Sequence, residues 1–134
     1  MPPRIMRDIL VVDRSMLAKN MYQLLFSAQT RFRVRFSDEY QTLFKKSRRM
    51  RPDLLIVNSN ALERDVPLEF PCPTVLIASK ERLDIKEQAA DQNGVVVIEK
   101  PFYPYDLISV ANGLITEFKG KKRYRRKKKG GGRV

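Results

Sequence analysis

Residues 8–13 read DILVVD, and this stretch decides the fold. A short, continuous run of branched apolar residues between two acidic ones is typical of a strand buried on both faces of a parallel sheet. Comparable runs recur at 53–57 (DLLIV), 73–78 (PTVLIA) and 95–98 (VVVI). The segment FRVRF at 32–36 alternates instead, which predicts a half-exposed strand with its arginines outward. The chain is therefore expected to contain five strands.

Helical patterns separate these strands. Residues 15–28 predict an amphipathic helix capped by Ser15. Its apolar stripe is expected to consist of Leu17, Met21, Leu24, Leu25 and Ala28. Further helices are expected at 39–50, 81–93 and 105–119. Strands that alternate with helices predict an α/β fold, a doubly wound parallel sheet covered on both faces.

Two local signals modify this alternation. Pro67, Pro71 and Pro73 interrupt the segment 58–73, which is barely long enough for a helix with two connections. A loop or a single turn is expected where a third helix would otherwise lie. Gly94 follows the helix of 81–93 and is expected to cap its C-terminal end.

Composition removes several classes of chemistry. The chain has 134 residues, enough for one domain with a real core, and it has no histidine. Histidine-based acid–base catalysis, Ser-His and Cys-His nucleophile pairs and most zinc sites are excluded, and no cofactor is expected. The single cysteine, Cys72, lies between two prolines, and the chain has no histidine to activate it. We therefore expect an unreactive loop thiol in a reducing compartment. No apolar run approaches the ~20 residues of a membrane span, so a cytoplasmic protein is expected.

Charge divides the chain in two. The net charge is +12, but residues 119–134 (KGKKRYRRKKKGGGRV) carry ten basic side chains and no acidic one, which leaves residues 1–118 at +2. A folded domain at 1–118 and a basic tail at 119–134, disordered when free, are expected. Such a tail indicates an anionic partner, with nucleic acid as the leading candidate and an acidic membrane surface or an acidic protein as alternatives.

The candidate polyanion-binding residues form two groups. The tail contributes Lys119, Lys121, Lys122, Arg123, Tyr124, Arg125, Arg126, Lys127, Lys128, Lys129 and Arg133. The end of the helix at 39–50 contributes Lys45, Lys46, Arg48, Arg49 and Arg51. Both groups, with Arg4, Arg7 and Arg31, are expected near the amino edge of the sheet if the strands take the order implied by the family resemblance given below. The alternative is a solvated, charged edge that protects the outer strand from aggregation.

The ends of the predicted strands carry polar residues, where a doubly wound sheet gathers its functional groups. These ends are Asp13-Arg14, Asn58, Ala78-Ser79 and Lys100-Pro101. With ILVVDRS at 9–15, PDLLIVN at 52–58, PTVLIAS at 73–79 and IEKPF at 98–102, the chain resembles the receiver domain of two-component response regulators. The resemblance covers about residues 7–118 and implies the flavodoxin-like strand order 2-1-3-4-5.

Receivers transfer a phosphoryl group from a histidine kinase to their own aspartate, using Mg²⁺ held by acidic residues. Residue by residue, this sequence departs from that pattern. Asn58 stands in place of the phospho-accepting aspartate, Arg14 in place of the second acidic residue, and Ala78 in place of the switch Ser/Thr. Val97 stands at the switch aromatic position. Only Asp13, Lys100 and Pro101 are retained.

The resemblance therefore implies an atypical receiver, a pseudo-receiver whose pocket is vestigial and holds no metal. We expect it to be a non-phosphorylated, non-enzymatic interaction module. Phosphorylation at Ser59 or Ser79 is the alternative. We hypothesise that Arg14 or Lys100 pairs with Asp13 in place of the metal charge; alternatively, Asp13 caps the first helix. The Lys100–Pro101 bond is expected to be cis, as in receivers.

Tyr103 and Tyr105 open the last helix. Receivers commonly signal through the surface of the fourth helix, fifth strand and fifth helix, here 81–93, 95–98 and 105–119, so both tyrosines are candidate contacts for a protein partner. The alternative is that they are ordinary half-buried aromatics. A protein–protein adaptor, whose tail only localises it, is a second interpretation of the whole chain. The oligomeric state is open between a monomer and a homodimer.

Overall fold

The computed structural model describes residues 7–28, 31–38, 52–64, 67–70 and 72–116. All strands of its sheet are parallel, in the order β2-β1-β3-β4-β5. The strands are β1 (Arg7–Val12), β2 (Phe32–Ser37), β3 (Leu54–Asn58), β4 (Thr74–Ala78) and β5 (Val95–Glu99). The predicted fold class and strand order are confirmed.

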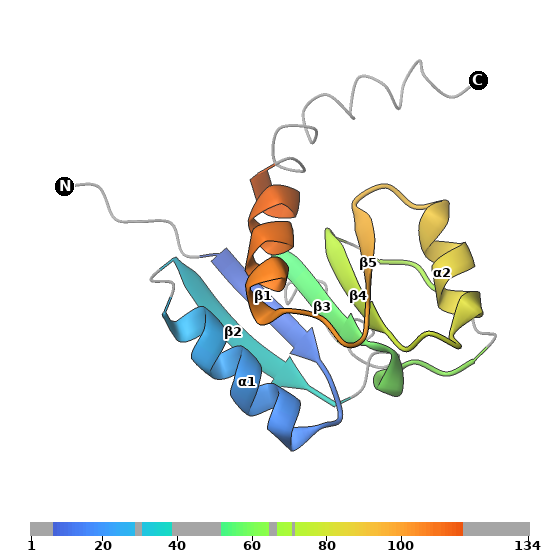
Figure 1. Ribbon diagram of the computed structural model, residues 1–134. Helices are drawn as coiled ribbons and strands as arrows, with labels where there is room; N and C mark the ends of the chain where they lie inside the picture. The colour runs from blue at the N-terminus through green and yellow to red at the C-terminus, as the bar shows by residue number, and fades with distance from the viewer. Residues whose placement is uncertain (1–6, 29–30, 39–51, 65–66, 71, 117–134) are drawn as a thin grey trace, which may run out of the picture.

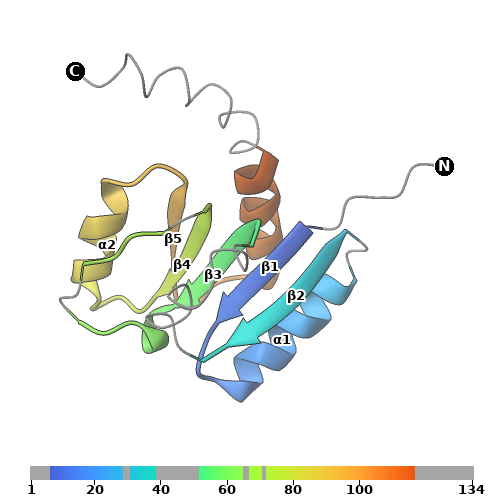
Figure 2. The ribbon, with the colours of Figure 1, turned by 180° about the vertical axis from the view of Figure 1, so that it is seen from behind.

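Helices cover the sheet on both faces (Figures 1 and 2). One face carries α1 (Met16–Ser27) and a helix of residues 104–116; the other carries the 3-10 turn η2 (Ser59–Ala61) and α2 (Leu83–Ala90). Alternate residues of each central strand enter the two cores, because successive side chains point to opposite faces. The apolar runs of β1, β3 and β4 are buried on both faces for this reason, whereas the run predicted at 95–98 forms the edge strand β5 and is only partly buried.

The helix at 16–27 forms where it was predicted, but with a different buried face. The Ser15 hydroxyl accepts a hydrogen bond from the Ala18 amide at 3.2 Å, so the predicted cap is confirmed. The predicted stripe is only partly correct: Met21 and Leu25 pack against the core, but Leu17 and Leu24 are exposed, and Tyr22 and Phe26 are the fully buried residues. Successive side chains of a helix point about 100° apart, so a small rotation about the helix axis exchanges one face for another. In this helix the larger side chains Tyr22 and Phe26 face the sheet.

A loop replaces the third helix of the alternation, as the prolines predicted. In the described part of 59–73, only the single turn of η2 is helical. Arg82, almost fully buried, fixes this loop by donating to the carbonyl oxygens of Ser59, Leu62 and Glu63 at 3.0, 3.1 and 3.2 Å. It also pairs with Asp84, Nε to Oδ1 at 3.0 Å.

Other helix boundaries differ from the predictions. The helix predicted at 81–93 spans only Leu83–Ala90, and Gly94 lies in the following turn with φ of 78°. That positive φ explains the glycine, since other residues rarely adopt it. The helix predicted at 105–119 is observed at 104–116, where the described range ends, and the one at 39–50 lies outside the described residues. Within the described ranges, no helix is long and apolar enough to span a bilayer.

Candidate functional site

Three polar side chains meet at the carboxyl edge of the sheet, where β1 and β3 end. Asp13 follows β1, Asn58 is the last residue of β3, and Asn60 lies in η2. The side chain of Asp13 is completely buried and that of Asn58 nearly so. A buried carboxylate needs hydrogen-bond donors, and the surrounding loops supply them.

Asp13 receives three such hydrogen bonds. The Asn58 amide nitrogen donates to Asp13 Oδ2 at 2.9 Å, and the Asn60 amide nitrogen donates to Oδ1 at 3.0 Å. The backbone N–H of Ser15 donates to Oδ1 at 2.8 Å. Both carboxylate oxygens are therefore occupied, and bonds to an ionised acceptor are the stronger kind.

The two amide oxygens complete the network. The Asn60 backbone N–H donates to Asn58 Oδ1 at 3.0 Å, and the Arg14 backbone N–H donates to Asn60 Oδ1 at 3.2 Å. Each asparagine thus uses both ends of its amide group. The network joins the loops after β1 and β3 without a second charged side chain.

The hypothesis of an ion pair to Asp13 is wrong for both cations. The Arg14 side chain turns away, its Nε lying 3.5 Å from the Asp38 carbonyl oxygen. The charge of Lys100 acts on the carboxylate of Glu81 instead. There, hydrogen bonds from the Glu81 backbone and from Ser79 lower the carboxyl pKa, and the charges of Arg64 and Lys100 lower it further. Neutral amides satisfy Asp13 without the desolvation cost of a second buried charge.

The alternative of Asp13 as a helix cap is also corrected. Ser15 is the capping residue of α1, and Asp13 braces the turn before it through the Ser15 amide. Tyr22 of α1 is buried within reach of the same charge. Burial raises the pKa of the Tyr22 phenol above its ordinary value, and the negative charge of Asp13 raises it further.

The remaining strand-end residues lie along the same edge. Ala78 is buried at the end of β4, and its carbonyl oxygen accepts from the Lys100 N–H at 3.0 Å. The Ser79 N–H donates to Ser59 Oγ at 3.4 Å. The Lys100–Pro101 peptide bond is cis, as predicted. The structure therefore brings the predicted pocket residues to one edge, and among the described residues only Asn58 and Asn60 bind Asp13 through their side chains.

Asn60 is a residue of the candidate site that the sequence analysis did not identify. It lies two residues after Asn58, directly beyond a buried strand. That spacing places a second amide at the same strand end, and it is the signal that could have identified the residue.

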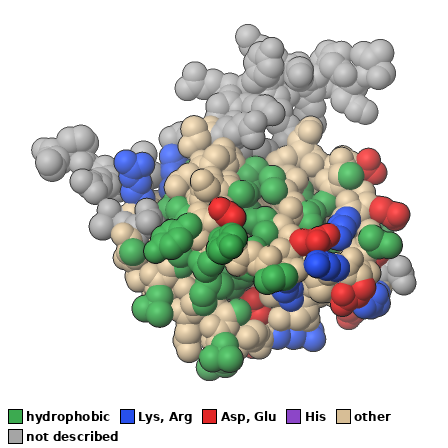
Figure 3. All heavy atoms as spheres, viewed as in Figure 1, with side chains coloured by type: hydrophobic (Ala, Val, Ile, Leu, Met, Phe, Trp, Pro, Cys, Tyr) green, Lys and Arg blue, Asp and Glu red, His purple; other side chains and the backbone are tan. Residues whose placement is uncertain are grey.

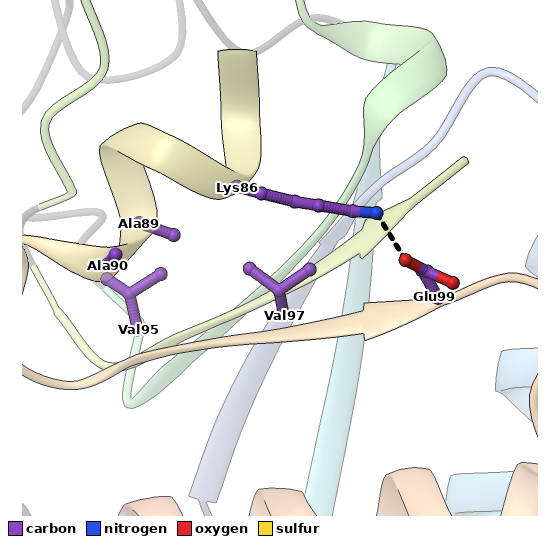
Figure 4. Close-up of a pocket in the computed structure, with 6 residues that line it drawn as sticks. All are labelled: Lys86, Ala89, Ala90, Val95, Val97 and Glu99. Carbon is purple, nitrogen blue, oxygen red and sulfur yellow. Dashed lines mark hydrogen bonds and ion pairs between the residues drawn. The ribbon is translucent and has the colours of Figure 1, made fainter. Parts of the chain in front are cut away.

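A second candidate surface lies between α2 and β5. A cavity of about 430 Å³ is lined by Lys86, Ala89, Ala90, Val95, Val97 and Glu99. In Figure 4 the small side chains of α2 and β5 face each other, and the Lys86–Glu99 ion pair lies at one end. Val97 occupies the position where the resemblance implies an aromatic side chain.

The two tyrosines that follow this strand are strongly exposed. Tyr103 is 77% and Tyr105 79% exposed, so the alternative that they are half-buried aromatics is wrong. An exposed aromatic ring offers a large apolar surface, and tyrosine is enriched at protein interfaces. Both residues are therefore free to contact a partner.

Only part of the basic surface is described. The Arg7 N–H donates to the Arg31 carbonyl oxygen at 2.7 Å, so these two arginines lie together at the amino edge of the sheet. The helix of 104–116 ends at that edge (Figure 1). The tail at 119–134, Arg4 and the cluster at 45–51 lie outside the described residues.

No protein-family model matches the chain, and no curated protein matches it either. Solved structures do. A response regulator from Thermotoga maritima matches with a TM-score of 0.65 at 22% identity, covering 84% of this chain and 99% of its own. A response regulator receiver protein from Burkholderia phymatum matches with 0.63 at 13% identity, covering 82% and 95%.

NtrX from Brucella abortus matches with a TM-score of 0.70 at 20% identity. The match covers 90% of this chain and 30% of the NtrX chain, so it concerns one part of that larger protein. These identities establish an architecture and leave the chemistry of the site open. The chain has the fold of a response regulator receiver domain.

Proposed function

We propose that this chain is a receiver-like signalling module that works without phosphoryl transfer. The observation that carries this proposal is the Asn58 amide, which stands at the acceptor position and donates its hydrogen to Asp13 at 2.9 Å. An amide nitrogen shares its lone pair with the carbonyl group, so it is not a usable nucleophile toward phosphorus. The side-chain carbonyl oxygen of Asn58 accepts a hydrogen bond from the Asn60 backbone N–H.

The same network disfavours the metal that the reaction needs. Mg²⁺ in such sites is held by one or two carboxylates together with water and phosphate oxygens. Asp13 is the only carboxylate in the network, and both of its oxygens already accept hydrogen bonds from protein donors. A metal ion would have to displace these donors. Within the described ranges, no three His, Cys, Asp or Glu side chains are grouped to hold a metal.

The alternative phosphorylation sites, Ser59 and Ser79, are also poorly placed to accept a phosphoryl group. Ser59 is buried, and its hydroxyl oxygen accepts from the Ser79 amide. Ser79 hydrogen-bonds the Glu81 carboxylate, which favours the ionised acid. Incubation with acetyl phosphate and Mg²⁺, followed by intact mass, is expected to leave the mass unchanged. A gain of one phosphoryl group would contradict the proposal, and peptide mapping would then identify the acceptor.

The proposed protein-binding surface comprises α2, β5 and the start of the helix at 104–116. It combines the exposed Tyr103 and Tyr105 with the apolar cavity beside Val97. Aromatic side chains and small apolar hollows are typical features of protein interfaces. Binding at this surface does not require phosphorylation. The proposed module would therefore bind its protein partner constitutively.

The tail is proposed to bind nucleic acid or another polyanion. Ten basic residues without an acidic one favour phosphate contacts that release counterions. Flexible lysines and arginines hold no fixed register on base edges, so sequence discrimination is expected to be weak. Arg7 and Arg31 lie at the amino edge of the sheet, where the helix of 104–116 ends, and they would extend this surface.

Titration with duplex and single-stranded nucleic acid at several salt concentrations tests this part. If six to ten phosphates are contacted, affinity is expected to fall by roughly 10³–10⁵ between 50 and 200 mM salt. A chain lacking 119–134 is the control and is expected to bind far more weakly. A flat salt response, or full affinity without the tail, would remove the nucleic-acid function and favour the adaptor.

A further inference from the structure

The outer face of α1 carries an apolar row that its own fold leaves uncovered. Leu17 is 82% and Leu24 74% exposed, while Tyr22 and Phe26 take the buried side. Two further residues continue the row, the partly exposed Met21 and the exposed Ala28. We call Leu17, Met21, Leu24 and Ala28 the α1 seam. In Figure 3, hydrophobic side chains gather over the helix at the lower left.

The spacing within the α1 seam is that of a helix-pairing surface. Its residues are separated by four, three and four positions, which is the alternation of the apolar positions in a heptad. Leucines at one heptad position and smaller or flexible side chains at the other suit close approach of a second helix. Met21 lies at the edge of this row and packs partly against the core, whereas Leu17 and Leu24 remain exposed in the part of the chain that the structure describes.

The same face of α1 carries no free charge. Lys19 is the only ionisable side chain on α1 besides Tyr22, and it pairs with Asp38. This absence stands out in a chain of net charge +12. A polyanion would find no cation to bind there. A surface without charge lets two identical, strongly basic chains approach with the least repulsion.

We propose that the α1 seam binds the α1 seam of a second copy of this chain. The two helices run antiparallel about a twofold axis near Asn20 and Met21. Residue pairs whose numbers sum to 41 then lie opposite each other, so each Leu17 meets the Leu24 of the other copy, while Ala28 lies beyond the overlap of the two helices. A twofold interface of this kind is self-complementary, because each contact occurs twice. Antiparallel pairing also aligns the two helix dipoles favourably.

The available area fits a weak but specific dimer. Leu17, Leu24 and the neighbouring Met16, which is 72% exposed, each offer on the order of 150 Å², so two copies cover about 900 Å² with these side chains alone. Adjacent exposed residues such as Gln23 bring the interface near the ~1,200 Å² of small specific complexes. Interfaces at this lower limit of size are typical of transient complexes, so dimerisation is expected to depend on protein concentration.

Sedimentation of the full chain without nucleic acid tests the proposal. Over 1–200 μM protein in 300 mM salt, the mass is expected to rise from the 15.6 kDa of one chain toward twice that value. The double variant Leu17→Glu/Leu24→Glu is expected to stay monomeric with an unchanged thermal midpoint, since both side chains are exposed in the monomer. Leu83→Glu, at an exposed leucine of α2, is the matched control and is expected to dimerise normally.

Two results would overturn the proposal. One is a wild-type chain that remains monomeric at 200 μM; the other is a double variant that dimerises as well as wild type. High salt separates this test from the polyanion function, because screening relieves repulsion between the tails while it weakens nucleic-acid binding.

A cross-link tests the antiparallel geometry. Asn20→Cys, next to the twofold axis, is expected to form an intermolecular disulfide rapidly under mild oxidation. The native Cys72 is buried and stays unreactive. Ser109→Cys, on the exposed face of the helix at 104–116, is the control and is expected to cross-link slowly. Equal rates for the two variants would contradict this geometry.

Discussion

Replacing Asn58 by aspartate places a second carboxylate against Asp13. In the native chain the two side chains are joined by a 2.9 Å hydrogen bond in a buried site. The variant exchanges the donating amide nitrogen for an oxygen of the same size. Two unit charges about 4 Å apart repel by about 4 kcal/mol at the effective dielectric constant of ~20 that suits protein sites. One carboxyl group escapes this repulsion only by holding a proton.

The cost of Asn58→Asp therefore depends on pH. The shared proton raises the pKa of one carboxyl group in the folded state above its unfolded value of ~4. A raised folded-state pKa gives stability that is present below pH ~4 and is lost as pH rises. Relative to wild type, the free energy of unfolding is expected to fall by about 1.4 kcal/mol per pH unit above that point, toward a loss of about 4 kcal/mol at pH 7.

Urea unfolding between pH 4 and 7 measures this effect. Asn58→Ala is the matched control, since it removes the amide without adding charge. Its cost is expected to be about 2 kcal/mol and to vary little with pH. If Asn58→Asp shows the pH dependence of wild type, or loses less than about 1 kcal/mol at pH 7, the two side chains are not in buried contact and the reasoning is refuted.

Three further predictions concern the scaffold and are measured by thermal or urea unfolding. Gly113→Ala is expected to raise stability by about 0.5–1 kcal/mol, because a Cβ there meets nothing within 4 Å and the residue lies inside a helix; a loss would contradict that placement. Arg82→Ala is expected to cost about 3 kcal/mol by removing the hydrogen bonds to three loop carbonyls and the ion pair with Asp84. A cost below about 1 kcal/mol would show that the loop does not depend on it. Deleting residues 119–134 is expected to change the melting temperature little; a large drop would show that the tail packs on the domain.

The sheet could be predicted from the sequence because its signals are local and agree. Four continuous apolar runs and one alternating run each identify a strand, and motifs at their ends give the order. The α1 helix was harder, because its sequence holds two overlapping apolar stripes. The leucine stripe has the more regular spacing, but Tyr22 and Phe26 bury more surface. Packing against the sheet decides between the stripes, and periodicity alone cannot.

The site was predictable in its location but not in its bonding. Strand ends place Asp13 and Asn58 together in any sheet of this order. The sequence shows that Arg14 and Lys100 are cations near that edge, but it does not show where their side chains point. The Arg14 side chain extends toward Asp38, and neutral amides take its expected place at Asp13. Burial of a compensating charge costs more than an amide hydrogen bond, which explains the outcome.

The measurement that tests the central claim most directly is phosphoryl labelling of an acceptor-restoration series. Wild type, Asn58→Asp and Arg14→Asp/Asn58→Asp are incubated with acetyl phosphate and Mg²⁺ and compared by intact mass. We expect no label on wild type or on Asn58→Asp, and label only where Arg14→Asp also restores the second residue of the acidic pair that receivers carry beside Asp13. Labelling of wild type, or strong labelling of the single variant, would contradict the account of a receiver fold that works without phosphoryl transfer.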